Sequence, residues 1–245
     1  MKNNFDIVVQ KFGGSSVATP EKIREVALFI KERLTSVPRI CVVVSAMGHT
    51  TNELLRLAHE VNSNPSKREL DMLISCGERT SMALLAMALH GQGISALSLT
   101  GSQSGIITDE EHSGAEIVAI RPERVHQAFA LNQVVLIAGF QGMSRSKEIT
   151  TLKRGGSDTT AVAMAAALGA KACEIYSDVC GVMDIDPRVI ETAEILPEIT
   201  LSEMSAMSLY GAKVMAYDAA LLAEKLGIEL LIAKTGDQKG GTSIR

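Results

Sequence analysis

The sequence predicts an α/β fold in which a mostly parallel central sheet is sandwiched by helices. Short β-branched runs alternate with longer helical patterns, which is typical of strands joined by crossover helices. Most of these runs are apolar throughout, as expected for strands buried on both faces of a sheet. No internal repeat, low-complexity tract or linker divides the 245 residues, so we expect one continuous unit.

Six runs are the expected strands, because each is short and rich in apolar or β-branched residues. They are Ile7 to Gln10, Ile40 to Ser45, Ile94 to Leu99, Val134 to Ala138, Cys173 to Ser177 and Ile228 to Ala233. A chain of this length can bury about three quarters of its unfolded surface, so it is long enough to form a substantial core.

Capping residues mark the expected helices. Thr19 is a favourable N-cap before a first-turn proline, Pro20, and Ser66 with Glu69 makes a capping box. The expected helices run from Pro20 to about Leu34, from Ser66 towards His90, from near Ser157 to before Gly169, and from about Gly211 to Leu226 with Gly227 just after its end.

Charge and composition favour a small-molecule partner. The 24 Lys and Arg face 28 Asp and Glu without blocks of one sign, which argues against a nucleic-acid or acidic membrane surface. The four cysteines form no CxxC pair, so we expect reduced thiols and no metal-ligating set. The first ten residues lack a signal-peptide core, and the longest apolar run, Met82 to Leu89, is far shorter than the ~20 residues of a membrane span. We expect a cytoplasmic protein.

The first strand leads into a candidate anion site. Lys11 would lie at the carboxyl end of the sheet, and Gly13 and Gly14 let backbone amides approach an anion closely. An ordinary strand-to-helix turn explains the glycine pair alone more readily. The segment matches neither GxxxxGK[ST] nor GxGxxG, so it is neither a Walker A loop nor a dinucleotide fingerprint.

A second glycine segment, Thr150 to Thr160, carries a stronger signal. We expect Ser157 to be the N-cap of the following helix, with Gly155 and Gly156 exposing amides at the positive end of the helix dipole. Arg154 adds a planar donor fork suited to a carboxylate. Packing alone explains this combination poorly.

A third cluster, Ser177 to Arg188, follows another expected strand. Its aspartates could bind a hard cation, but their spacing lacks the closing Glu of an EF-hand. Asp and Pro also build turns for local reasons, so both interpretations remain open.

These segments, in this order, resemble the aspartate kinases of the amino acid kinase superfamily, and the resemblance covers essentially the whole chain. The matching stretches are Lys11 to Val17, Val42 to Asn52, Ser75 to Arg79, Leu99 to Asp109, Ala138 to Gly142, Thr150 to Ala161, Ile175 to Val182, Asp186 to Val189, Gly211 to Val214 and Gly241 to Ile244.

The resemblance implies the amino acid kinase fold and a site for ATP, Mg²⁺ and L-aspartate. The implied catalytic residues are Lys11, Asp158 and Lys213. The implied substrate-binding residues are Ser45, Thr51, Glu78, Arg154 and Ser157, with Arg154 on the α-carboxylate and Glu78 on the ammonium group. The implied nucleotide-binding residues are Lys11, Gly13, Gly14, Ser15, Gly155, Gly156, Ser177, Asp178, Met183, Asp184, Asp186, Pro187, Arg188, Lys213 and Val214.

The implied reaction is ATP-dependent phosphorylation of the aspartate side chain to 4-phospho-L-aspartate, the first step of the aspartate-family amino acid pathway. One alternative is another amino acid kinase, acting on glutamate, N-acetylglutamate, carbamate or UMP. The other is a non-catalytic ligand-binding relative. Four departures from the family pattern adjoin the site: Lys153, Cys180, Asp184-Ile185 and Ala216-Tyr217.

The resemblance also implies one catalytic domain over residues 1 to 245, with a substrate lobe and a nucleotide lobe that meet near Ala138 to Gly156. We expect no regulatory ACT domain in this chain and no feedback inhibition by lysine or threonine. A homodimer is compatible with the resemblance, whereas nucleic-acid and membrane partners are not expected.

Overall fold

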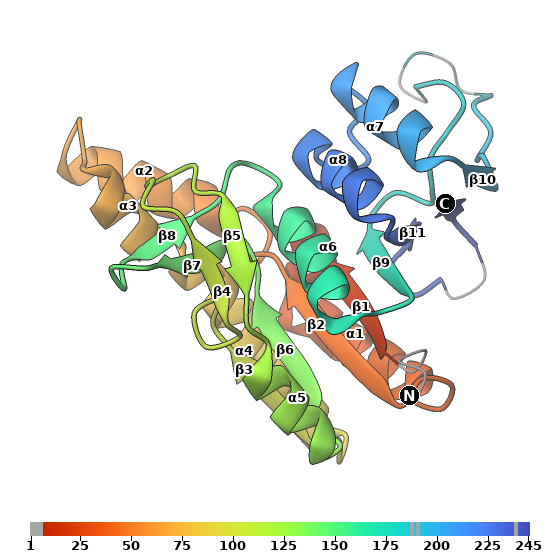
Figure 1. Cartoon of the computed structure of the whole chain (residues 1–245), viewed down its shortest axis with the longest axis horizontal. Coiled ribbons are helices and arrows are strands. Elements are labelled where there is room, and N and C mark those ends of the chain that lie inside the picture. Colours follow the sequence, from red (N-terminus) through yellow and green to blue (C-terminus); the bar gives the residue numbers. More distant parts are fainter. Residues whose placement is uncertain (1–6, 187–188, 190–191, 238–239) are drawn as a thin grey trace.

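A computed structural model describes residues 7–186, 189, 192–237 and 240–245. Its central sheet has eight strands in the order β10-β12-β11-β9-β1-β2-β6-β3 (Figure 1). Every neighbouring pair in this sheet is parallel except β11 and β12. The predicted fold class is therefore confirmed.

All six predicted strands lie in the central sheet. Their observed bounds are β1 (Ile7–Phe12), β2 (Arg39–Val44), β3 (Ala96–Leu99), β6 (Val134–Ala138), β9 (Ala172–Ser177) and β11 (Glu229–Lys234). The short strands β10 (Glu198–Ile199) and β12 (Thr242–Ile244) extend one edge. Strands β1, β2 and β6 are almost entirely buried, which explains their continuous apolar runs.

A smaller four-stranded sheet was not predicted. Its order is β5-β4-β7-β8, and it lies beside α3 (Lys67–Ile74) (Figure 1). The strands are β4 (Ile106–Thr108), β5 (Ile117–Ile120), β7 (Gln141–Ser144) and β8 (Ile149–Thr151). With three or four residues each, they are too short to show a clear periodicity in the sequence.

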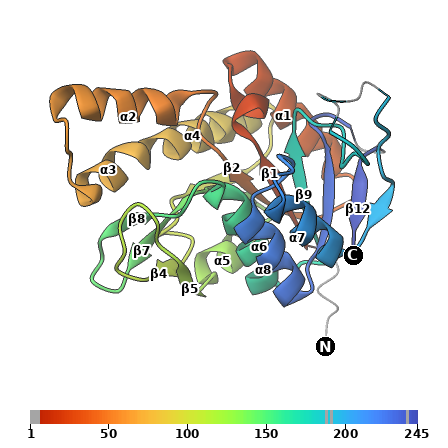
Figure 2. The same ribbon diagram turned by 90° about the horizontal axis from the view of Figure 1, so that it is seen from above.

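Helices cover both faces of the central sheet (Figure 2). On one face, α1 (Pro20–Arg33) and α4 (Cys76–Gly91) pack against each other and enclose one hydrophobic cluster. The opposite face carries α5 (Glu123–Ala130), α6 (Gly156–Leu168), α7 (Leu201–Leu209) and α8 (Tyr217–Leu226) around a second cluster. The remaining helices are η1 (Gly14–Val17), α2 (Thr50–Val61) and α3.

The helix predictions hold at α1 and need correction elsewhere. Thr19 caps α1 as predicted, and Ser66 caps α3. The Glu69 carboxylate accepts from Arg68 and not from the Ser66 amide, so only half of that capping box forms. The expected single helix towards His90 is two helices that meet at Ser75.

One predicted N-cap and one predicted helix start are wrong, whereas α6 begins near Ser157 and ends before Gly169 as predicted. Gly155, with φ of +82°, caps α6, and Ser157 lies buried inside the first turn. Helix α8 begins at Tyr217 and not near Gly211. The Ala216 amide donates to the Asp158 carboxylate (3.4 Å), so the chain before α8 follows the glycine loop in an irregular path. Lys213 therefore lies in a loop.

The segment Lys67–Gly91, which spans α3 and α4, is long and apolar enough to cross a membrane by length and composition alone, and its most apolar 18-residue window has a mean hydropathy of 1.3. Half of its most apolar window is buried inside the fold. Leu85 and Leu89 of α4 are fully buried in the cluster shared with α1. Burial in the core thus accounts for this hydropathy.

Candidate active site

An ion pair stands at the carboxyl end of the central strand β1. Lys11 is 8% exposed, and its Nζ lies 2.7 Å from Oδ1 of Asp158 in the first turn of α6. The other oxygen of Asp158 accepts from the Ala216 amide (3.4 Å). Asp158 therefore fixes the Lys11 ammonium and anchors the loop that carries Lys213.

A cavity of about 490 Å³ opens beside this ion pair. Ten predicted site residues line it: Lys11, Gly14, Ser45, Thr51, Glu78, Arg154, Gly155, Gly156, Ser157 and Asp158. They come from the ends of β1 and β2, the first turns of α2, α4 and α6, and the loop before α6. The fold thus brings distant segments of the sequence to the carboxyl edge of the sheet, where open α/β folds bind ligands.

Glu78 is the most unusual group in this cavity. Its residue is 3% exposed, and Oε1 accepts from the Ala46 amide (3.2 Å). Oε2 is buried and has no hydrogen-bond partner among the described residues. Burial raises the pKa of Glu78 from 4.5 to about 7, and the Ala46 bond offsets only part of that effect. A buried carboxylate oxygen without a donor favours a cationic ligand.

Arg154 supplies a cation at the mouth of the same cavity. Its side chain is exposed, and its guanidinium makes no ion pair or hydrogen bond with any residue that the structure describes. The planar fork is free to bind a carboxylate in bidentate geometry. The following position, 155, requires glycine, because a Cβ on Gly155 would overlap Ala216.

A neighbouring cleft of about 680 Å³ shares a wall with this cavity. Arg154, Gly155 and Asp158 line both, and residues 211–218 form the other side. Lys213 and Val214 line this cleft, and Lys213 is exposed. Lys11 lines the first cleft and Lys213 the second, and the glycine loop forms the wall between them. A polyanion that extends across this wall could contact both ammonium groups.

Four of the residues predicted to bind the nucleotide gather near the end of β1. The Gly13 amide donates to the Tyr176 carbonyl (2.9 Å), and Ser15 Oγ donates to Asp178 Oδ1 (3.3 Å). A Cβ on Gly13 would touch the Ser177 side chain at 3.6 Å. These contacts bring Gly13, Ser15, Ser177 and Asp178 together.

The following loop lies outside both cavities. Met183, Asp184 and Asp186 line neither of them, and Asp184 Oδ1 instead accepts from the Glu194 amide (2.9 Å). Pro187 and Arg188 lie outside the described residues. Within the described part of the chain, no group of three or more His, Cys, Asp or Glu side chains is placed to hold a metal ion. The nucleotide-binding role of this loop stays a prediction.

Sequence reasoning missed several residues of the cavity wall. Ser113 and Phe140 both line the cavity and both have positive φ, +60° and +66°. The Ser-Gly pair at 113 and 114 is a turn signal, whereas nothing in the sequence marks Phe140. The other residues not predicted in the cavity are Ala46, Gly48, Asn52, Leu55, Leu70, Ile74, Thr151, Leu152 and Lys153.

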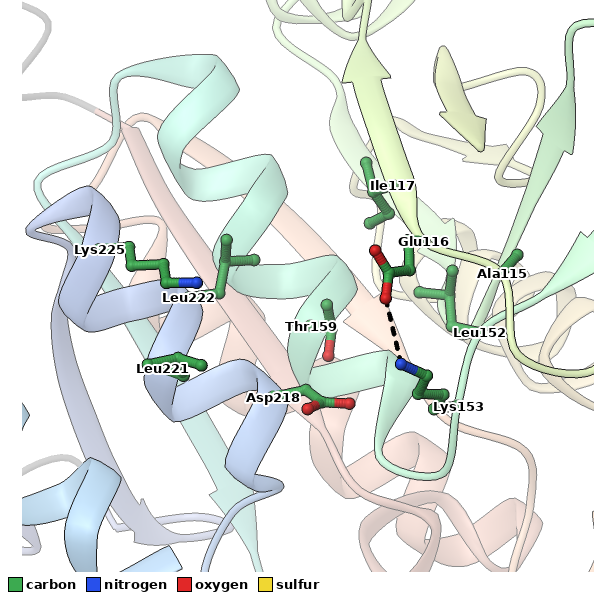
Figure 3. Close-up of a pocket in the computed structure, with 10 residues that line it drawn as sticks. All are labelled: Ala115, Glu116, Ile117, Leu152, Lys153, Thr159, Asp218, Leu221, Leu222 and Lys225. Carbon is green, nitrogen blue, oxygen red and sulfur yellow. Dashed lines mark hydrogen bonds and ion pairs between the residues drawn. The ribbon is translucent and has the colours of Figure 1, made fainter. Parts of the chain in front are cut away.

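Lys153 also borders a third cleft, of about 260 Å³, between α8 and β5 (Figure 3). Its Nζ lies 3.1 Å from Glu116 Oε1, and this ion pair is exposed. Glu116 first, and Asp218 to a smaller extent, raise the pKa of Lys153 above its ordinary value. Lys153 is thus paired with the segment before β5.

Together, the mostly parallel sheet and the two clefts lined by charged side chains at its carboxyl edge define an open α/β fold. The model of the amino acid kinase family matches residues 6–234. The chain belongs to the amino acid kinase family, and the resemblance seen in the sequence is confirmed.

Individual relatives point in the same direction. The chain is 47% identical over 239 residues to an aspartokinase of Geobacillus stearothermophilus, covering 98% of this chain and 59% of that relative. An aspartate kinase structure from Synechocystis matches with a TM-score of 0.87 and 43% identity, over 97% of this chain and 39% of that one. E. coli aspartokinase III, in complex with aspartate and ADP, matches with a TM-score of 0.87 and 26% identity, over 97% and 64% of the two chains.

Proposed function

We propose that this chain transfers the γ-phosphoryl group of ATP to the side-chain carboxylate of L-aspartate, giving 4-phospho-L-aspartate and ADP. The observation that carries the proposal is the buried, unpartnered oxygen of Glu78 in a cavity that also holds Lys11 and Arg154. Aspartate has one cation and two anions, which the Glu78 carboxylate and the Lys11 and Arg154 cations would complement. The other two charged residues of the cavity already have partners, Asp158 in Lys11 and Lys153 in Glu116. The aspartokinase relatives and the complex of one of them with aspartate and ADP support the same substrate pair.

The cavity suggests how aspartate would lie. Its ammonium group would pair with Glu78, and its α-carboxylate would meet the Arg154 fork. Ser45, Thr51 and Ser157 add hydroxyl groups to the same cavity. The side-chain carboxylate is then left to face Lys11 and the shared wall of the two clefts.

The chemistry requires no general base. The substrate side chain has a pKa near ~3.9, so its carboxylate is already ionised at neutral pH. One of its oxygens donates an electron pair to the γ-phosphorus, the bond from that phosphorus to the bridging oxygen breaks, and ADP leaves with that pair. The main obstacle is repulsion between two anions. Lys11, Lys213 and the amides around Gly13 and Gly155 would offset it.

Asp158 would act by orientation. Its ion pair with Lys11 and its bond to the Ala216 amide fix an ammonium group on one side of the glycine loop and the Lys213 segment on the other. Mg²⁺ would reach this site on the nucleotide phosphates, because the described residues offer no metal cage of their own. When bound, it would neutralise part of the phosphate charge.

A coupled assay of ADP release, with hydroxylamine to trap acyl phosphates, tests the proposal. Aspartate should yield a hydroxamate, whereas glutamate, N-acetylglutamate, carbamate and UMP should not support turnover. Turnover with glutamate alone would identify another amino acid kinase. Binding of aspartate without ADP release would identify a non-catalytic relative. The single catalytic domain, the cytoplasmic location, the pathway role and the homodimer remain predictions.

A further inference from the structure

Asp71, in α3, is a fully buried carboxylate that the proposed chemistry does not use. It accepts from both the amide (3.0 and 3.1 Å) and the hydroxyl (3.1 Å) of Ser113, and it lies 2.8 Å from Nδ1 of His112. The Thr151 hydroxyl also donates to it. Asp71 thus collects hydrogen bonds from the segment between β4 and β5 and from β8.

Two of these donors belong to residues of the substrate cavity. Ser113 and Thr151 both line it, whereas Asp71 stands behind them and does not. The Ser113 backbone is left-handed, a conformation that a non-glycine residue keeps only when its surroundings hold it. The Gly114 and Ala115 amides also donate to the Thr151 carbonyl, which ties the two segments together.

The hydrogen bonds also fix which way these hydroxyl groups point. A hydroxyl has one hydrogen to donate and lone pairs with which to accept. In Ser113 and Thr151 that hydrogen is committed to Asp71. Thr151 is fully buried, so only the exposed Ser113 can meet a ligand with its hydroxyl, and there it can act only as an acceptor.

We propose that Asp71 is a positioning residue that makes this wall of the cavity selective for an ammonium group. Through Ser113 it presents an acceptor to the cavity that Glu78 also lines, and together with the unpartnered oxygen of Glu78 this acceptor favours an ammonium group over a second carboxylate. An amino acid with two carboxylates is thereby bound in one orientation. The inference rests on the proposed function, because it assigns the ammonium end of aspartate to this wall.

The test compares aspartate with succinate, which has the same two carboxylates and no ammonium group. In the unmodified protein, KM for aspartate and the inhibition constant of succinate measure the preference for an ammonium group. Asp71→Ala removes the acceptor of the Ser113 hydroxyl hydrogen, which can then turn towards a carboxylate. We expect the preference for aspartate over succinate to fall by about tenfold, with KM for ATP changed less than about twofold.

Glu174→Ala is the matched control. Glu174 is a second buried carboxylate, with donors from Gln10 (2.7 Å), Arg33 (2.5 Å) and Tyr176 (3.0 Å). It points to the α1 face of the sheet, opposite the Lys11 side chain, and lines none of the three clefts described above. Its loss should lower stability and leave the preference for aspartate unchanged.

Ser113→Ala carries the test if Asp71→Ala does not fold, because it removes the exposed acceptor and leaves the Asp71 carboxylate in place. It should lower the preference several-fold. Equal losses of aspartate and succinate binding in Ser113→Ala, or the same change in Glu174→Ala, would overturn the inference.

The proposed function can fail separately. If the unmodified protein forms no hydroxamate, the proposed function is rejected. The preference for aspartate over succinate would then be measured by how much each ligand raises the Tm of the unmodified protein and of the variants. Equal stabilisation of the unmodified protein by the two ligands, or by neither, would overturn the role of Asp71.

Discussion

Replacing Glu78 with Gln should stabilise the free protein at alkaline pH while abolishing the binding of aspartate. The buried carboxylate has a pKa of about 7 in the folded chain against an ordinary 4.5. Folding therefore disfavours the ionised form. This loss of folding stability is absent at a pH well below 4.5, grows between pH 4.5 and about pH 7, and is fully present above that.

The size of the effect follows from the two pKa values. At about 1.4 kcal/mol per pH unit, the gap from 4.5 to about 7 amounts to roughly 3 kcal/mol at pH 8, and to less than about 1 kcal/mol at pH 5. Gln does not ionise and so avoids this cost. For a chain of this size, the gain corresponds to roughly 6 to 12 °C in Tm at pH 8.

Thermal unfolding from pH 5 to pH 8, with and without aspartate, measures both effects. The advantage of Glu78→Gln should grow with pH, and aspartate should stabilise the unmodified protein but not Glu78→Gln. Glu25→Gln, at an exposed position of α1, is the control and should show neither effect. A difference between Glu78→Gln and the unmodified protein that does not vary with pH would refute the idea that this carboxylate ionises while buried.

Three further substitutions separate the roles of the cationic side chains. Arg154→Ala should raise KM for aspartate roughly tenfold or more and KM for ATP far less, since a charge-assisted hydrogen bond contributes about 1.5 to 3 kcal/mol; equal changes in both constants would contradict its assignment. Lys213→Ala should lower kcat more than either KM, because its charge matters most during transfer, and an unchanged kcat would remove it from the mechanism. Lys153→Met should change KM for aspartate by less than about threefold, because its ion pair with Glu116 is exposed; a larger effect would place Lys153 on the substrate.

The central sheet and the glycine loop could be predicted because their signals are local. A run such as Val134 to Ala138 is buried on both faces, so its composition alone identifies a strand. The loop from Arg154 to Asp158 combines residue types that only a charged ligand explains. Glu78 lies in a helical pattern where a charge is usually solvated, and its functional role came from the family resemblance.

The missed features depend on contacts between distant segments. Asp71 meets Ser113 across 42 residues and Thr151 across 80, and no local pattern connects them. The start of α8 was misplaced because the Ala216 amide bonds to Asp158, which lies 58 residues earlier. Tertiary contacts of this kind override local helix propensity.

The contact between Gly155 and Ala216 limits how this site can change under selection. No side chain fits at position 155 while Ala216 stands against it, and a larger residue at 216 would press on the backbone of the glycine loop. The two positions should therefore behave as one unit in a mutant library. Functional clones that enlarge Ala216 would have to carry a compensating shift of the Lys213 segment, and single enlargements at position 155 should be missing from the survivors.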